Sequence, residues 1–173
     1  LTVGANDLVI DCNGFVINGS NSGSDYGIDI SSFNNITIRE CYISDFARGI
    51  SISSSSNITA IANTFFNQTE KDILADSASN QVNVTDSIFI GVGLIDSNDY
   101  NIDLASDNSN IINNTVYSTI EDGTIVVGIV MSSGAENFLI KANHVSHSYI
   151  GIATGGATGG IIRDNTLKNL SGG

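Results

Sequence analysis

A chain of 173 residues with 41% apolar and only 14% charged residues can bury the core of one domain, which excludes a disordered protein. Its formal net charge of -12 would repel a phosphate backbone, so we expect no nucleic-acid partner. No apolar run is long enough for a membrane-spanning helix, so we expect no membrane insertion. We expect a single domain over residues 1–173. The chain begins with Leu1, which is consistent with a processed protein or a segment of a longer one.

Short strands separated by turns are expected along the whole chain, beginning with 8–10. Segments of the form Gly-Ile-x-Ile follow at 27–30, 49–52, 128–131 and 151–154, with degenerate copies at 72–75 and 101–104. A second strand starts six to eight residues after the first Ile of each copy, at Asn35, Asn57, Asn80, Asn108, Asn137 and Gly159. Apolar and polar residues alternate in these segments, which predicts strands with one face turned inward.

The repeat predicts a solenoid. Its first column contains Ile28, Ile50, Ile73, Ile102, Ile129 and Ile152, which are 22 to 29 residues apart. Such a unit is too short for a strand-helix-strand crossover, and each coil can bury its apolar face only by stacking on its neighbours. The Leu-x-x-Leu-x-Leu signature of leucine-rich repeats is missing. We therefore predict an all-β, right-handed parallel β-helix of about seven coils.

A polar column is expected beside the core. It contains Cys12, Cys41, Asn63, Asp86, Asn114, Asn143 and Asn165. Equivalent residues in a parallel stack lie about 4.8 Å apart, so the Asn side chains can pass hydrogen bonds from coil to coil, and we favour this structural ladder over ligand binding. A further apolar column is expected at Ile43, Phe65, Ile88, Val116, Val145 and Leu167.

The segment Val9-Ile10-Asp11-Cys12-Asn13-Gly14 and the repeated Gly-Ile-x-Ile followed by Asn-x-Thr-Ile resemble the NosD-like parallel β-helix repeat family of archaeal and bacterial surface proteins. The resemblance covers nearly the whole chain. It implies the β-helix fold, which supports lyases, hydrolases, adhesins and surface proteins alike. It also suggests a metal-handling accessory role, which ranks last because the chain lacks a Cys/His/Met cluster.

The two cysteines have three possible states. Cys12 and Cys41 are expected on adjacent coils, at a spacing that a disulfide can bridge. Parallel side-chain directions would hold their Cβ atoms too far apart for a relaxed bridge, so we expect a buried thiol pair before a disulfide. Metal ligation comes last, because no second Cys or His pair accompanies them. We expect no cofactor and no well-defined metal site.

Two long connections, 91–100 and 117–126, interrupt the repeat on consecutive coils. They are expected to form a shelf that contains Asp96, Asp99, Glu121, Asp122 and, on the next coil, His147. Clustered carboxylates suit weak Ca²⁺ binding or acid and base chemistry on a glycan. A solvated acidic rim is the interpretation we favour, because an acidic cluster alone has low specificity.

Tyrosines and glycosylation motifs give further candidate sites. Tyr26, Tyr100 and Tyr149 precede the Gly-Ile-x-Ile strand or its degenerate copy and could form a platform for sugar rings, although packing within the turns is the simpler interpretation. Among seven Asn-x-Ser/Thr motifs, Asn18 and Asn67 are the expected glycosylation sites because they fall in exposed turns.

The function expected first is structural. We predict a non-catalytic extracellular or cell-surface module of a sheath, filament, surface layer or adhesin, which stacks end to end with itself or with flanking domains. The alternative is a β-helix that binds or cleaves cell-surface polysaccharide at the acidic shelf. The motifs of polygalacturonase-like hydrolases do not occur in the sequence.

Overall fold

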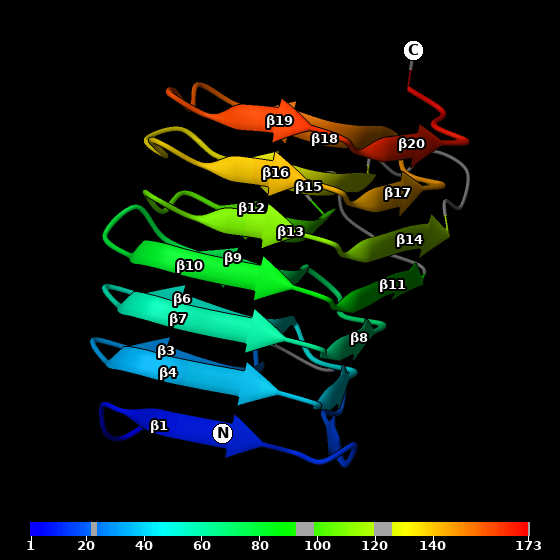
Figure 1. The fold of residues 1–173 in the computed structure, drawn as a ribbon. Helices are drawn as coiled ribbons and strands as arrows, with labels where there is room; N and C mark the ends of the chain where they lie inside the picture. The colour runs from blue at the N-terminus through cyan, green and yellow to red at the C-terminus, as the bar shows by residue number, and fades with distance from the viewer. Residues whose placement is uncertain (22–23, 93–98, 120–125, 173) are drawn as a thin grey trace.

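The structure is a computed structural model, and it describes residues 1–21, 24–92, 99–119 and 126–172. Within these ranges every regular element is a β-strand, and the strands stack coil upon coil into a rod (Figure 1). Neighbouring strands of each sheet are parallel. The predicted parallel β-helix is therefore confirmed.

Three sheets run along the rod, and the described residues give six strands in sheet A and seven each in sheets B and C. Sheet A contains β3 (Tyr26–Ser31), β6 (Arg48–Ser53), β9 (Lys71–Ala75), β12 (Asp99–Leu104), β15 (Val126–Met131) and β18 (Ile150–Thr154). Sheet B contains β1 (Leu8–Asp11), β4 (Asn34–Arg39), β7 (Ser56–Ile61), β10 (Asn80–Thr85), β13 (Asn110–Ile112), β16 (Leu139–Lys141) and β19 (Ile161–Arg163). Sheet C contains β2 (Val16–Asn18), β5 (Tyr42–Ser44), β8 (Thr64–Phe66), β11 (Ile88–Val92), β14 (Thr115–Thr119), β17 (His144–Ser146) and β20 (Thr166–Lys168).

The core is a set of inward-facing columns, because alternate residues of each strand point to the same side. The isoleucine column of sheet A pairs in the predicted register, and Ile28, Ile50, Ile73, Ile102 and Ile129 are fully buried. In sheet C, the rings of Phe65 and Phe89 stack with their centroids 4.8 Å apart. Each coil thus covers the apolar face of the next.

The predicted register of sheet C is wrong at one coil. Phe89, not Ile88, pairs with Phe65 and Val116 and is buried, whereas Ile88 is 44% exposed. The sequence Ile88-Phe89-Ile90 is apolar throughout, so alternation alone does not distinguish its inner from its outer residues.

The corner between sheets A and B repeats in every coil. Its residues have positive φ angles between 52° and 66° at Asp7, Asn35, Asn57, Gln81, Asn108, Asn137 and Gly159. Asn, Asp and Gly tolerate this left-handed conformation better than other residues, which explains why they recur at the start of the second strand. At this corner the chain changes direction and passes from sheet A into sheet B.

Candidate functional site

A buried ladder runs along the corner between sheets B and C. The Oδ1 atom of Asn143 accepts hydrogen bonds from the backbone N of Asn114 at 2.9 Å and from its Nδ2 at 3.0 Å. Asn165 accepts the equivalent bonds from Asn143, and Asn63 accepts one from the backbone N of Cys41. Each Asn Nδ2 also donates to a carbonyl of sheet B. These side chains bind coil to coil and leave no free group for a ligand.

Asp86 does not belong to this ladder, contrary to the prediction. It is exposed at a left-handed turn and accepts a hydrogen bond from Asn113 at 2.6 Å. Ser87 takes the ladder position: its Oγ accepts from the backbone N of Asn63, and its backbone N donates to Asn114. A serine hydroxyl fills the buried position without the cost of desolvating a carboxylate.

Cys12 and Cys41 form a disulfide, so the expected thiol pair is wrong. Asp11 pairs with Arg39, and Cys12 follows Asp11 by one residue whereas Cys41 follows Arg39 by two. Cys12 is therefore offset from the ladder column, and the parallel side-chain directions assumed in the prediction do not apply. The Cα atoms lie 4.7 Å apart, a separation that a disulfide spans.

The acidic shelf falls largely outside the described residues. Asp96, Glu121 and Asp122 lie there, and for Asp99 only the backbone is described, at the start of β12. His147 occupies a left-handed turn, with its ring centroid 4.7 Å from that of Tyr117 and its Nε2 3.2 Å from Asn169. The shelf therefore stays a prediction.

The structure places two of the three tyrosines of the expected sugar platform in one column. Tyr26 and Tyr100 occupy the same outward column of sheet A, at the N-terminal ends of β3 and β12. Tyr149 lies one residue before this column, where Ile150 pairs with Val127. Tyr149 is 38% exposed and belongs to the turn that precedes β18.

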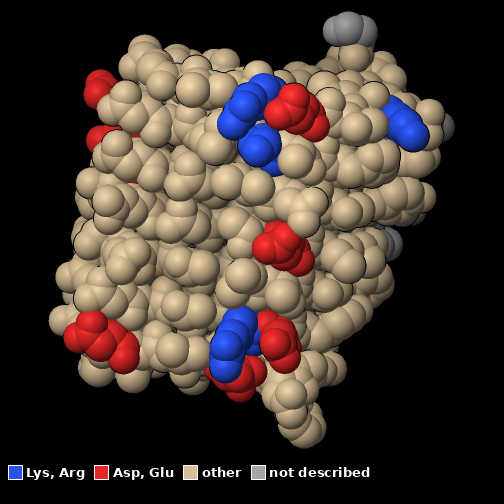
Figure 2. Space-filling view, in the orientation of Figure 1, with Lys and Arg blue, Asp and Glu red and all other residues tan. Residues whose placement is uncertain are grey.

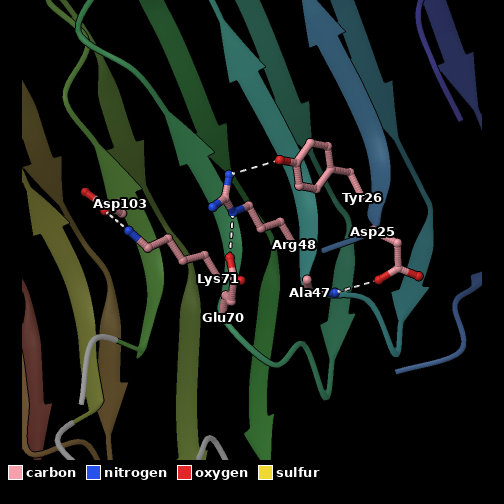
Figure 3. Close-up of polar contacts among 7 residues, drawn as sticks. All are labelled: Asp25, Tyr26, Ala47, Arg48, Glu70, Lys71 and Asp103. Atoms are coloured by element: carbon pink, nitrogen blue, oxygen red, sulfur yellow. Dashed lines mark hydrogen bonds and ion pairs between the residues drawn. The ribbon is translucent and has the colours of Figure 1, made fainter. Parts of the chain in front are cut away.

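Arg48 and Lys71 fill the column between the two tyrosines. Figure 3 shows both together with Tyr26. Arg48 donates from Nε to Glu70 at 2.8 Å, and its guanidinium carbon lies 5.2 Å from the centre of the Tyr26 ring. The Nζ of Lys71 lies 2.5 Å from an Asp103 oxygen and 4.7 Å from the centre of the Tyr100 ring. Two cation and aromatic pairs thus stand side by side on the outer face.

A buried polar chain lies behind this face. Asn101 donates from Nδ2 to the Asp72 carboxylate at 2.7 Å, and Ser118 donates to the Oδ1 of Asn101 at 2.8 Å. Burial raises the pKa of Asp72 to about 7, against the opposing effect of hydrogen bonds from Asn101 and Gln68. The carboxyl therefore titrates near neutral pH rather than near 4.

The two expected glycosylation sites differ in their surroundings. Asn18 is exposed at the end of β2, and its Nδ2 donates to the Gly19 carbonyl at 3.1 Å. Asn67 is half-buried, and its Nδ2, the atom that a glycan would modify, donates to Asp45 at 2.7 Å. Asn18 is thus the better placed of the two.

Comparison with protein families identifies the family to which this β-helix belongs. Residues 4–173 match the family described as periplasmic copper-binding protein (NosD). The chain belongs to the NosD family. The resemblance noted in the repeats is confirmed over nearly the full length of the chain, while no curated protein sequence matches it.

The described residues of this NosD-family chain do not fit a copper site. Both cysteines are used in the disulfide, and Met131 is fully buried in the core. No group of three or more His, Cys, Asp or Glu side chains in the described ranges could hold a metal ion. Copper favours thiolate, thioether and imidazole ligands, which this part of the chain does not bring together.

Solved structures share the fold of the NosD-family chain at low sequence identity. An alginate lyase from Paenibacillus sp. str. FPU-7 aligns with a TM-score of 0.68 and 16% identity, over 88% of this chain and 56% of its own. PfbA, a surface adhesin of Streptococcus pneumoniae, aligns with a TM-score of 0.59 and 15% identity, over 86% of this chain and 51% of its own. The chain thus spans about half the length of these proteins. In the described ranges, no helix is long and apolar enough to cross a membrane.

Proposed function

We propose that this NosD-family chain is a non-catalytic structural module of an extracellular or cell-surface protein, and that its coil edges pair with those of a second copy. The disulfide supports an oxidising compartment outside the cytoplasm. The ladder bonds that join coil to coil support a stiff rod.

The proposal is carried by opposite charges on β1 and β19, the two outermost strands of sheet B. One outward column of sheet B starts with Asp11, continues through Arg39 and Lys141, and ends with Arg163. A second copy with its β1 beside β19 would bring its Asp11 next to Arg163. Asp11 already makes such a pair with Arg39 within the chain, at 2.6 Å.

Apolar groups at the edges would be buried by the same contact. Ile162 and Leu167 at one edge are 46% and 44% exposed, and they lie in the same inward columns as Ile10 and Ile17 at the other edge. A hollow of about 400 Å³, lined partly by Ile152, Ile162 and Leu167, opens at the edge of the last coil. Another coil would fill it, as each coil of the stack covers its neighbour.

Basic side chains on the sheet B face also gather near the ends of the rod, beside acidic ones (Figure 2). Arg163 is 57% exposed, and its ion partner within the chain is the adjacent Asp164 at 4.0 Å. Such an exposed pair contributes little to stability, so Arg163 can exchange it for a partner across the junction at small cost.

The test is the mass of residues 1–173 in solution as a function of concentration, by light scattering and sedimentation. We expect a mass above 18.1 kDa that rises with concentration. Arg163→Glu and Asp11→Lys should each reduce association, because each places like charges at the junction. The double variant should restore it.

Lys141→Glu is the matched control, since Lys141 lies in the same column but inside the stack. It should leave association unchanged. A wild-type chain that stays monomeric at the highest soluble concentration would refute pairing with a second copy. Equal loss of association in Lys141→Glu and Arg163→Glu would show that the edge residues are not responsible.

A further inference from the structure

The outer face of sheet A carries a continuous row of two tyrosines and two cations. Tyr26, Arg48, Lys71 and Tyr100 pair strand to strand on β3, β6, β9 and β12. Neighbouring strands lie about 4.8 Å apart, so the two tyrosines are about 14 Å apart along the rod. The row is long enough to contact several sugar units of one chain.

The side chains of the row are held in place by their neighbours. Arg48 lies between the ring of Tyr26 and the carboxylate of Glu70, with its Nη1 3.4 Å from the Tyr26 hydroxyl (Figure 3). Lys71 is 18% exposed and its partner Asp103 only 7%. Because these groups are already ordered, a ligand would bind without paying again for side-chain entropy.

The row and its two ion partners offer both hydrogen-bond donors and acceptors. The guanidinium and the ammonium donate hydrogen bonds, the carboxylates of Glu70 and Asp103 accept them, and the tyrosine hydroxyls do both. Sugar hydroxyls likewise donate and accept, and the apolar face of a sugar ring packs against an aromatic ring. This combination matches a polymer rich in hydroxyl groups.

The charge of the row argues for a neutral ligand. Arg48 and Lys71 are each balanced by a carboxylate within 2.8 Å, Asp25 and Asp29 lie on or beside β3, and the whole chain has a net charge of -12. No unpaired cation is left in the row to attract a polyanion, and the surrounding field would repel one.

We infer that this row binds a neutral polysaccharide, with the sugar chain lying along the rod and its rings against Tyr26 and Tyr100. The row contains neither Asp11 nor Arg163, the residues that carry the proposed junction between copies. It adds a ligand to a module whose proposed function is structural, and it does not depend on association between copies.

Binding is tested by affinity electrophoresis and calorimetry with neutral polysaccharides, namely β-glucan, xylan, mannan and galactan, and with the polyanion alginate. We expect at least one neutral polymer to bind and alginate to bind more weakly or not at all. Tyr26→Ala and Tyr100→Ala should each weaken binding about fivefold to tenfold, from the energy of one aromatic contact.

Tyr149→Ala is the matched control, because Tyr149 is an exposed tyrosine outside the row. It should bind like the wild type. Unchanged thermal unfolding of the variants would show that lost binding is not lost folding, and Tyr→Phe variants that retain binding would support ring contact. Failure of all neutral polymers to bind, tighter binding of alginate, or equal effects at Tyr149 and Tyr26 would each overturn the inference.

Discussion

Asn101 donates a 2.7 Å hydrogen bond to Asp72 inside the solenoid. The two residues occupy the same column of neighbouring coils, and the coils before and after them have glycine in that column. At Gly49 an added Cβ would lie 2.6 Å from the Asp72 carbonyl oxygen and 2.7 Å from the Phe65 ring, so side chains are normally excluded there. Asp72 and Asn101 are 3% and 1% exposed. The exception to the repeat is therefore a buried polar pair.

The first prediction concerns pH. Because the pKa of Asp72 is raised from 3.8 to about 7, the unfolded chain ionises this residue between pH 4 and pH 7 while the folded chain keeps it protonated. The free energy of unfolding should fall across that window, by up to about 4 kcal/mol, and level off above it. Asp72→Asn should remove this dependence and be more stable than the wild type at pH 8.

Urea unfolding at pH 4.5 and pH 8 measures the effect. Glu136→Gln, at an exposed carboxylate, is the control and should follow the wild type. A wild-type protein that is equally stable at both pH values would show that Asp72 does not titrate in this window.

The second prediction tests the corrected register of sheet C. Phe89→Ala should lower the free energy of unfolding by about 3–5 kcal/mol, since it empties a fully buried position against Phe65. Ile88→Ala, one residue away on the outer face, should cost less than about 1 kcal/mol. Chemical denaturation of both variants checks the order. A larger cost at Ile88 would restore the register expected from the sequence.

The third prediction concerns the ladder. Asn114→Ala removes the acceptor of the buried Ser87 backbone N and the side-chain donor to the Val84 carbonyl, and a buried group left unsatisfied costs about 1–3 kcal/mol. Asn83, on the outer side of β10, accepts a hydrogen bond from Asn110 and is half-buried. Asn83→Ala should cost clearly less in the same unfolding experiment, and equal costs would argue against a structural ladder.

The fourth prediction concerns the disulfide, whose cysteines are 29 residues apart. Replacing both cysteines with serine should lower the free energy of unfolding by about 3 kcal/mol, because the unfolded chain is no longer cross-linked. Limited proteolysis should then cut the first coil before the rest. Wild-type protein with a reducing agent should behave in the same way, and insensitivity of the wild type to reduction would contradict the prediction.

The sequence predicts the columns well where one face is apolar and the other polar. The isoleucines that pair with Ile28 were placed correctly because a glycine, Asp72 or Asn101 precedes each of them and marks the repeat. The prediction failed at Ile88, where three apolar residues follow one another, and at Asp86, where a carboxylate was preferred to a serine as a ladder residue.

The candidate site was harder to predict than the fold. The tyrosines Tyr26 and Tyr100 were identified, but Arg48 and Lys71 were not placed in their row. A repeat pattern built on apolar residues gives no weight to outward positions, whose side chains differ from coil to coil. By alternation, the residue two places before each column isoleucine is expected to face inward. The residue between them, a glycine, Asp72 or Asn101, is buried as well, and this break in the alternation turns the preceding residue outward.

The left-handed corner that begins each strand of sheet B also governs how this protein can change in length. Every coil turns at the same backbone conformation, so a whole coil can be inserted or deleted without altering the corners above and below it. Removing one residue from a strand would instead reverse its inner and outer faces. Related chains should therefore lengthen or shorten by complete turns, and an engineered rod could be extended by duplicating one.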